Sequence, residues 1–206
     1  MELKNRMKNL MQKNKEFFNK IAKYYDKGIF KNWNKKVNKK IIETANIKKN
    51  SKILDAGCGT GNLLMLLQDL EKKKNPKVYG IDISEKMLKI AKAKLKTADL
   101  RLQSAENMNF KSNYFNYIFS VDTFHHYSNY DLAMRNFYRI LKKNGKLIVV
   151  ELNFGFIGNK IFHLIEPGNN KMHSKKEFKK LFQLYNFKRI KYKKVSLLNV
   201  LTIGKK

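Results

Sequence analysis

Cysteine is almost absent from the chain, which has a single one, Cys58, among 206 residues. One cysteine cannot form an internal disulfide or a cysteine-based metal cluster, so both are excluded and we expect no metal site. The scarcity fits a reducing compartment, and the location we expect is the cytoplasm.

Long apolar runs are also missing. The longest stretches, such as Leu63 to Leu67 and Leu147 to Val150, are far shorter than the ~20 residues that span a bilayer. The N-terminus, MELKNRMKNLMQKNKEFF, lacks the uninterrupted apolar region of a secretory signal. We therefore expect neither a membrane span nor secretion.

Acidic residues are few: 16 Asp and Glu stand against 45 Lys and Arg, which gives a formal net charge of +29. Such a charge attracts polyanions, which include nucleic acids, anionic lipid surfaces and acidic substrates. The lysines are spread along the whole chain, however, and Lys greatly outnumbers Arg. Because nucleic-acid surfaces tend to use Arg for bidentate phosphate contacts, we favour a compositional bias and keep nucleic acid as the less favoured partner.

The length and a hydrophobic content of 43% suit a single domain with a well-buried core. Internal repeats, Gly/Ser linkers and Pro-rich segments are missing from the sequence. We divide the domain into a helical cover for one sheet edge and the ligand mouth (1–50), a core (51–151), a lid segment (152–174), and a closing helix with two strands (175–206).

Strand and helix signals alternate from about residue 50. Strands are predicted at SKILDAG, KVYGIDI, LRLQSA, YFNYIFSV and KLIVVEL, and the helix after the fourth is expected to end at Asn144 and Gly145. This order predicts an α/β fold with a parallel, doubly wound sheet. Two closely spaced strands, FKRIKYKKV and NVLTIG, follow a helix with a Ser174/Glu177 capping box and should pair antiparallel.

The stretch ILDAGCGTGNL places Gly57, Gly59 and Gly61 directly after the first predicted strand. In open α/β sheets the ligand lies outside the carboxyl ends of the strands, and glycine lets a loop there approach it closely. The G-x-G-x-G spacing differs from the G-x-G-x-x-G of a dinucleotide fingerprint, and no Lys-Ser/Thr pair follows to make a P-loop. Asp55 would be a poor neighbour for a pyrophosphate and suits a ligand with a cationic end.

Asp82 ends the second predicted strand, about twenty residues beyond the last glycine. An acid at this place can accept hydrogen bonds from both hydroxyls of an unphosphorylated ribose. A surface-turn or N-cap role is the common alternative for an isolated Asp, but beside the glycine loop we favour the ribose role. The two features predict a nucleoside ligand with free ribose hydroxyls and a positively charged tail.

Five motifs in order, ILDAGCGTGNL, VYGIDIS, SAENMNF, FNYIFSVDTFHH and RILKKNGKLIVVE, resemble those of class I S-adenosylmethionine-dependent methyltransferases. The resemblance covers residues 17–150, and the C-terminal helix and strands agree with that family's Rossmann-like, seven-stranded sheet. It implies S-adenosylmethionine as cofactor and S-adenosylhomocysteine as product. The segments FFNKIAKYYDKGIF and FHH are similar to small-molecule members, among them the ubiquinone and menaquinone biosynthesis C-methyltransferases.

The resemblance also implies which residues contact the cofactor. Asp82 would hold the ribose, and Ile83 would pack on the adenine. Family members often carry Asp where Ser104 stands, so Glu106 or a backbone carbonyl is expected to contact the adenine amino group instead. The methionine part of the cofactor would contact Asp55, Gly57, Cys58, Gly59 and Gly61. The adenine edge would be lined by Ser104, Ala105 and Glu106. The sulfonium would lie beside Val121 and Asp122.

Methyl transfer from a sulfonium is an in-line displacement, in which the protein mainly aligns the acceptor and excludes water. Alignment alone can contribute roughly 7 to 11 kcal/mol, which makes a strong base optional. The candidate catalytic residues are Asp122, His125 and His126, although packing under the loop suits either histidine equally well. The candidate acceptor-cavity residues, which could equally be core aromatics, are Tyr24, Tyr25, Phe124, Phe154, Phe156 and His173.

Motifs that the sequence lacks narrow the range of possible methyl acceptors. Enzymes that methylate the amino groups of bases usually carry an Asn-Pro-Pro-Tyr/Phe stretch after the fourth strand, where this chain has SVDTFHH. Methylation of a pyrimidine at C5 needs a cysteine nucleophile, but Cys58 lies in the cofactor loop. The leading hypothesis is therefore a methyltransferase for a small or lipid-like acceptor. The alternatives are an RNA methyltransferase that uses the basic surface and a cofactor-binding protein without transfer activity. The oligomeric state is left open.

Overall fold

A seven-stranded sheet forms the centre of the computed structural model, which describes residues 2–27, 29–70, 74–153, 158, 168 and 170–206. The strand order is β3-β2-β1-β4-β5-β7-β6. Strands β1 to β5 run parallel, whereas β7 is antiparallel to both β5 and β6. The strands are β1 (Lys52–Ala56), β2 (Lys77–Asp82), β3 (Asp99–Leu102), β4 (Phe115–Val121), β5 (Leu141–Leu152), β6 (Lys188–Lys194) and β7 (Asn199–Lys205). The predicted doubly wound, Rossmann-like α/β sheet with its antiparallel C-terminal pair is confirmed.

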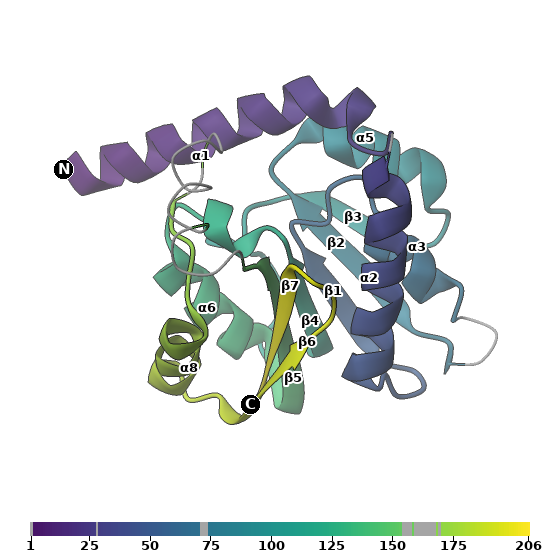
Figure 1. Cartoon of the computed structure of the whole chain (residues 1–206), viewed down its shortest axis with the longest axis vertical. Helices are drawn as coiled ribbons and strands as arrows, with labels where there is room; N and C mark the ends of the chain where they lie inside the picture. The colour runs from purple at the N-terminus through teal and green to yellow at the C-terminus, as the bar shows by residue number, and fades with distance from the viewer. Residues whose placement is uncertain (1, 28, 71–73, 154–157, 159–167, 169) are drawn as a thin grey trace.

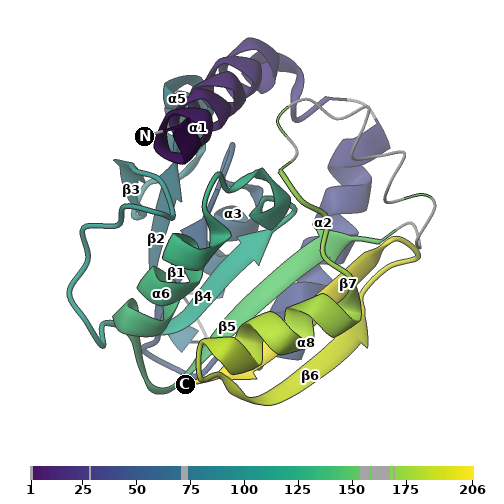
Figure 2. The ribbon, with the colours of Figure 1, turned by 90° about the vertical axis from the view of Figure 1, so that its left-hand side faces the viewer.

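Helices cover both faces of this sheet (Figures 1 and 2). On one face lie α2 (Ile29–Ala45), α3 (Asn62–Gln68) and α5 (Glu85–Lys94), and on the other lie α6 (Tyr130–Ile140) and α8 (Lys175–Leu184). Each face has its own apolar core, with Ile41 and Leu67 in the first and Phe137 and Phe182 in the second. The long helix α1 (Glu2–Ile21) and the 3-10 helix η1 (Ala22–Tyr24) lie across one end of the sheet (Figure 1).

The capping box predicted for the C-terminal helix is present, and a second helix also has a side-chain cap. Ser84 Oγ accepts a hydrogen bond from the Met87 backbone N–H at 3.1 Å, and Ser174 and Glu177 form the reciprocal capping box of α8. Each bond satisfies an N–H that the first turn of a helix would otherwise leave without a partner. Among the described residues, no helix is both long and apolar enough to cross a membrane.

The prediction that the helix after β4 ends at Asn144 and Gly145 was wrong. Helix α6 ends at Ile140, and β5 begins at the next residue because Leu141 already pairs with Phe115 of β4. Asn144, with φ of 65°, lies inside β5 where the register between the two strands shifts. The Asn-Gly pair therefore marks an irregularity in a strand, where Asn144 takes a positive φ of the kind that also occurs at helix ends.

The order of the strands determines where a ligand can enter. Strand β1 lies between β2 and β4, so the chain winds away from β1 in opposite directions on its two sides. The loops after β1 and β4 therefore diverge and leave a crevice at their carboxyl ends. The second 3-10 helix, η2 (Phe124–His126), follows β4 at this crevice.

Candidate functional site

The glycine loop after β1 is held tightly by its neighbours. Gly57 and Gly59 have φ angles of 81° and 52°, which favour glycine. A Cβ on Gly57 would come within 2.3 Å of Thr123 Oγ1. The Gly59 backbone N–H donates to Asp82 Oδ2 at 2.8 Å. The loop is thus pinned between the ends of β2 and β4.

Asp82 is largely enclosed and serves two loops. Its Oδ1 accepts a hydrogen bond from the Ser84 backbone N–H at 2.8 Å, while Oδ2 accepts the one from Gly59. Burial raises the pKa of Asp82, and the backbone hydrogen bonds to Ser84 and Gly59 oppose that rise. The carboxylate also lines the cavity described below, so one group both shapes the loop and faces the cavity.

Asp55, at the end of β1, is buried with an unsatisfied oxygen. It is 3% exposed, and its Oδ1 accepts no hydrogen bond from any residue that the structure describes. Burial, and secondarily the charge of Asp82, raise the pKa of Asp55 to about 8. A buried carboxyl of this kind is suited to a cation, because an ionised carboxylate away from water needs a positive or hydrogen-bonding partner.

A cavity of about 630 Å³, including its open mouth, lies at the carboxyl ends of these strands. Its floor is formed by Gly57 and Gly59 from the loop after β1 and by Asp82 and Ile83 from the end of β2. The remaining lining residues from the core are Met87, Gln103, Ser104, Ala105, Glu106, Asp122, Thr123, His126 and Tyr127. An adjoining hollow of about 490 Å³ shares Tyr25, Gly57 and Asp122 with the cavity and contains Asp55.

Helix α1 supplies the roof of the cavity with Met11 and Phe18. The roof is anchored through Asn14, which is fully buried and donates from Nδ2 to the His126 carbonyl at 2.8 Å. Phe18 also packs edge-on against the His126 ring, with 5.0 Å between the ring centroids. His126 therefore holds the roof and the loop after β4 together.

Asp26, just after η1, ties the N-terminal segment to the glycine loop. Its carboxylate accepts hydrogen bonds from Thr60 Oγ1 at 2.8 Å and Asn62 Nδ2 at 2.7 Å and forms a close ion pair with Lys94. Burial alone would raise the pKa of Asp26, but the hydrogen bonds from Lys94, Asn62 and Thr60 lower it. Sequence reasoning missed this cluster because the partners of Asp26 lie 34 to 68 residues away from it and carry no local signature.

The sequence profile of a family described as a methyltransferase domain matches residues 47–196. The chain belongs to this methyltransferase family. It is 33% identical over 144 residues to the demethylmenaquinone methyltransferase of Thermotoga maritima, a match that covers 66% of the chain and 59% of that protein. It is 32% identical over 146 residues to the ubiquinone/menaquinone biosynthesis C-methyltransferase of Campylobacter jejuni, covering 66% of the chain and 62% of that protein. The chain thus spans about three fifths of the length of these curated relatives.

The fold of the methyltransferase is also similar to solved structures. A crystal structure of an S-adenosylmethionine-dependent methyltransferase from Thermotoga maritima has a TM-score of 0.71 with 21% identity, and the similarity covers 93% of the chain and 99% of that protein. That protein is described as S-adenosylmethionine-dependent, and the geometry of the cavity fits such a cofactor. The unsatisfied oxygen of Asp55 suits its cationic end, and the carboxylate of Asp82 suits its ribose hydroxyls.

The structure brings most of the implied cofactor residues together. Gly57, Gly59, Asp82, Ile83, the 104–106 stretch and Asp122 line one cavity, while Asp55, Cys58 and Val121 line the adjoining hollow. Gly61 instead faces α5, where a Cβ would come within 2.7 Å of Leu95 Cδ1. Burial raises the pKa of the Cys58 thiol and keeps it neutral, so the side chain packs as a small apolar group.

Glu106 of the methyltransferase is already engaged at one oxygen. Its Oε1 accepts hydrogen bonds from the backbone N–H groups of Ser128 and Asn129 at 2.8 and 3.3 Å and from Ser128 Oγ at 2.9 Å. This bonding fixes the start of α6 against the loop after β3. A contact of this side chain with an adenine amino group would have to use Oε2.

The two candidate histidines have different positions. His126 lines the cavity, whereas His125 is 2% exposed and its Nδ1 forms a short contact with Glu151 Oε2 of β5. The other oxygen of Glu151 accepts a hydrogen bond from the Phe124 backbone N–H at 2.8 Å. His125 therefore anchors η2 to β5. Asp122, with φ of 48°, lines the cavity and accepts a hydrogen bond from Asn199 Nδ2 of β7 at 3.0 Å.

The candidate acceptor residues separate in the same way. Tyr25 lines the cavity, but Tyr24 is 57% exposed and lies beneath the ammonium groups of Lys23 and Lys27. Phe124 and His173 pack on each other and on Phe178, with ring centroids 5.1 to 5.6 Å apart, and burial lowers the pKa of His173. These two belong to the core around α8. Phe154 and Phe156 lie outside the described residues, as does most of the predicted lid segment 152–174.

The pKa of Asp55 predicts a pH-dependent affinity for the cofactor. Below about pH 8 the folded methyltransferase holds Asp55 mainly protonated. A cation that requires the ionised carboxylate therefore displaces the proton of Asp55 when it binds. We expect the affinity for S-adenosylmethionine to rise by up to about tenfold per pH unit between about pH 6 and 7.5. Titration calorimetry across this range measures the slope, and an Asp55→Asn variant should have a flat profile. An equal affinity at both ends of the range for the natural chain would contradict the assignment.

Proposed function

We propose that this methyltransferase transfers the methyl group of S-adenosylmethionine to a small-molecule acceptor that binds beside His126. The observation that carries the proposal is the row of carboxylates Asp55, Asp82 and Asp122 at the ends of β1, β2 and β4. A row of acids in a chain with a net charge of +29 suits a cationic nucleoside rather than a phosphate. When bound, S-adenosylmethionine supplies an electrophilic methyl group, and its transfer leaves a neutral thioether.

The residues of the chain have separate tasks in this proposal. Asp82 accepts hydrogen bonds from the ribose hydroxyls, and Asp55 pairs with the ammonium end of the cofactor. Ile83 packs on the adenine. Met11 and Phe18 of the roof exclude water from the reacting centre, which protects an alignment-driven displacement. His126 lines the cavity with an imidazole ring, a group that can accept a proton from the acceptor.

For the acceptor we propose an electron-rich ring of the hydroquinone type. The names of the two relatives, a demethylmenaquinone methyltransferase and a ubiquinone/menaquinone biosynthesis C-methyltransferase, support this class. A ring carbon of the reduced form is nucleophilic: it forms the bond to the methyl carbon while the carbon–sulfur bond breaks, and the ring then loses its proton. The acidic cavity agrees with an uncharged acceptor, because a phosphate there would meet Asp82 and Asp122.

The test is formation of S-adenosylhomocysteine by the purified chain. Reduced demethylmenaquinone, its oxidised form and total RNA are offered separately with S-adenosylmethionine. Product from the reduced ring alone is the expected result. Product from RNA alone would overturn the acceptor class, and tight cofactor binding without product from any acceptor of a metabolite extract would leave a binding protein without transfer activity.

The role of His126 is tested by His126→Gln. If its ring accepts the acceptor proton, kcat should fall by about a hundredfold while the affinity for S-adenosylmethionine changes little. His125→Gln is the matched control, because its contact with Glu151 predicts a loss of thermal stability instead. Turnover, titration calorimetry and thermal melting separate the two effects. An unchanged kcat in His126→Gln would show that this imidazole is not the base.

A further inference from the structure

The positive charge is concentrated at one edge of the molecule. Residues 171–198, which we call the basic edge, contain ten Lys and Arg and one acidic residue, a net charge of +9. The other 178 residues together carry +20, so the charge per residue is about three times higher on the basic edge. A uniform compositional bias toward lysine does not explain this difference.

The basic edge consists of α8, β6 and the turn after β6. Strand β6 is the last strand of the sheet, with β7 as its one strand neighbour among the described residues. All ten basic side chains are exposed, and the acid, Glu177, is paired with Lys171 at 2.9 Å. The exposed basic residues are Lys171, Lys175, Lys176, Lys179, Lys180, Lys188, Arg189, Lys191, Lys193 and Lys194.

Two exposed leucines bracket β6. Leu184, at the end of α8, is 70% exposed, and Leu197, in the turn after β6, is 74% exposed. Among the described residues, these are the two most exposed large apolar side chains. Strand β6 has seven residues and is about 23 Å long, so a leucine stands near each end of a strip of lysines.

From this arrangement we propose that the basic edge docks on the surface of an anionic lipid bilayer. Lysines attract anionic headgroups, and aliphatic side chains beside them enter the boundary between headgroups and acyl chains. Lysines on an edge strand also block unwanted strand pairing, but that role explains neither the lysines of α8 nor the two leucines.

The composition of the basic edge favours a bilayer over a nucleic acid. Nine of its ten basic residues are lysines, whereas phosphate and base recognition prefers the fork of arginine. Single-stranded nucleic acids also need exposed aromatic rings for stacking. The exposed aromatic side chains of the described residues, Tyr24 and Tyr25, belong to η1 and its C-cap rather than to the basic edge.

Sedimentation with vesicles tests the proposal on the full chain, without cofactor or acceptor, so its outcome is independent of the proposed methyl transfer. We expect binding to vesicles that contain phosphatidylglycerol, none to pure phosphatidylcholine, and release by added salt. Lys176→Gln with Lys179→Gln should weaken binding by about fivefold for each lysine removed. Leu197→Ser should weaken it further.

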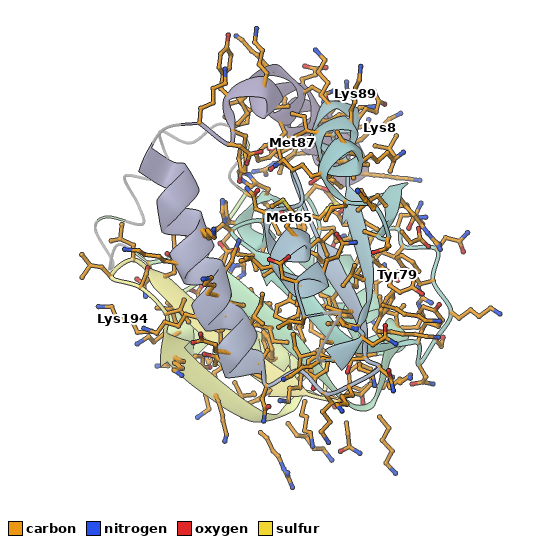
Figure 3. All side chains as sticks on the ribbon, turned by 90° about the vertical axis from the view of Figure 1, so that its right-hand side faces the viewer. Lys8, Met65, Tyr79, Met87, Lys89 and Lys194 are labelled. Carbon is orange, nitrogen blue, oxygen red and sulfur yellow. The ribbon has the colours of Figure 1, made fainter. Side chains whose placement is uncertain are left out.

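Matched variants at the opposite edge of the sheet provide the control. Lys89 and Lys92 of α5 are likewise exposed and three residues apart, and Figure 3 shows Lys89 and Lys194 on opposite sides of the molecule. Lys89→Gln with Lys92→Gln removes the same charge and should leave vesicle binding nearly unchanged, as should Leu102→Ser on β3. Equal losses from both pairs, or no binding to anionic vesicles, would overturn the proposal. Tighter retention on RNA than on vesicles, with a steep salt slope, would assign the surface to nucleic acid instead.

Discussion

Asp82→Ala is expected to weaken binding of S-adenosylmethionine by between about tenfold and a hundredfold. A charged acceptor for two hydroxyls contributes roughly 1.5 to 3 kcal/mol. The variant also loses the bonds from the backbone N–H groups of Gly59 and Ser84 to the carboxylate, which hold the glycine loop and the start of α5. Titration calorimetry measures the affinity, and an unchanged value would disprove the ribose assignment.

Two further variants separate the ligand contact from the structural one. Asp82→Asn keeps an oxygen that can accept from Ser84 but removes the charge, so it should retain the fold and still bind weakly. Asp99→Ala, which removes an acid from the neighbouring strand β3 where it pairs with Arg101, should bind the cofactor normally. A loss of affinity in Asp99→Ala as large as that in Asp82→Ala would indicate a general effect of charge.

Gly57→Val is expected to abolish measurable cofactor binding and to lower the melting temperature. The added side chain meets three atoms of Thr123 within 2.9 Å and stands at a φ of 81°, so the loop must move out of the crevice. Gly59→Ala is the matched comparison, because its nearest neighbour is Tyr25 Cε1 at 4.0 Å. Because a φ of 52° also disfavours a Cβ, it should melt below the natural chain but above Gly57→Ala, which adds the clash to the same kind of strain.

The clash itself can be tested by removing its other partner. Combining Gly57→Ala with Thr123→Gly deletes every Thr123 side-chain atom that the new Cβ would meet. This pair should recover stability relative to Gly57→Ala alone, since the backbone strain is shared by both. If the single substitution binds the cofactor as tightly as the natural chain, the close approach of Gly57 to Thr123 is not required for the site.

The parts of the site that follow strands could be predicted from the sequence. Asp55, the glycines and Asp82 stand at strand ends, and parallel strands bring their carboxyl ends to one edge. The FHH segment could not be resolved in this way. Which of His125 and His126 faces the cavity depends on how η2 is turned, and Glu151, 26 residues away, determines that by bonding Phe124 and His125.

The polar contacts that anchor the roof could not be predicted from the sequence either. Asn14 is one of many asparagines in a lysine- and asparagine-rich chain, and its partner is a backbone carbonyl 112 residues away. Every residue has a backbone carbonyl, so the sequence does not indicate which one accepts such a hydrogen bond. Asn199 bonds a side chain, that of Asp122, but the two residues are 77 positions apart and share no local pattern. Local patterns predict elements and their ends, whereas contacts between distant loops follow only from the assembled sheet.

The carboxylates of the cavity lie inside a strongly positive molecule, and this contrast affects the kinetics of cofactor binding. S-adenosylmethionine carries a net positive charge, so the exterior repels it on approach, whereas Asp55, Asp82 and Asp122, which we propose as its contacts, would attract it once inside. Salt screens the exposed charges far more than the buried ones. Association measured by stopped flow should therefore become faster as the ionic strength rises, with little change in dissociation, the reverse of what a polyanionic ligand would show.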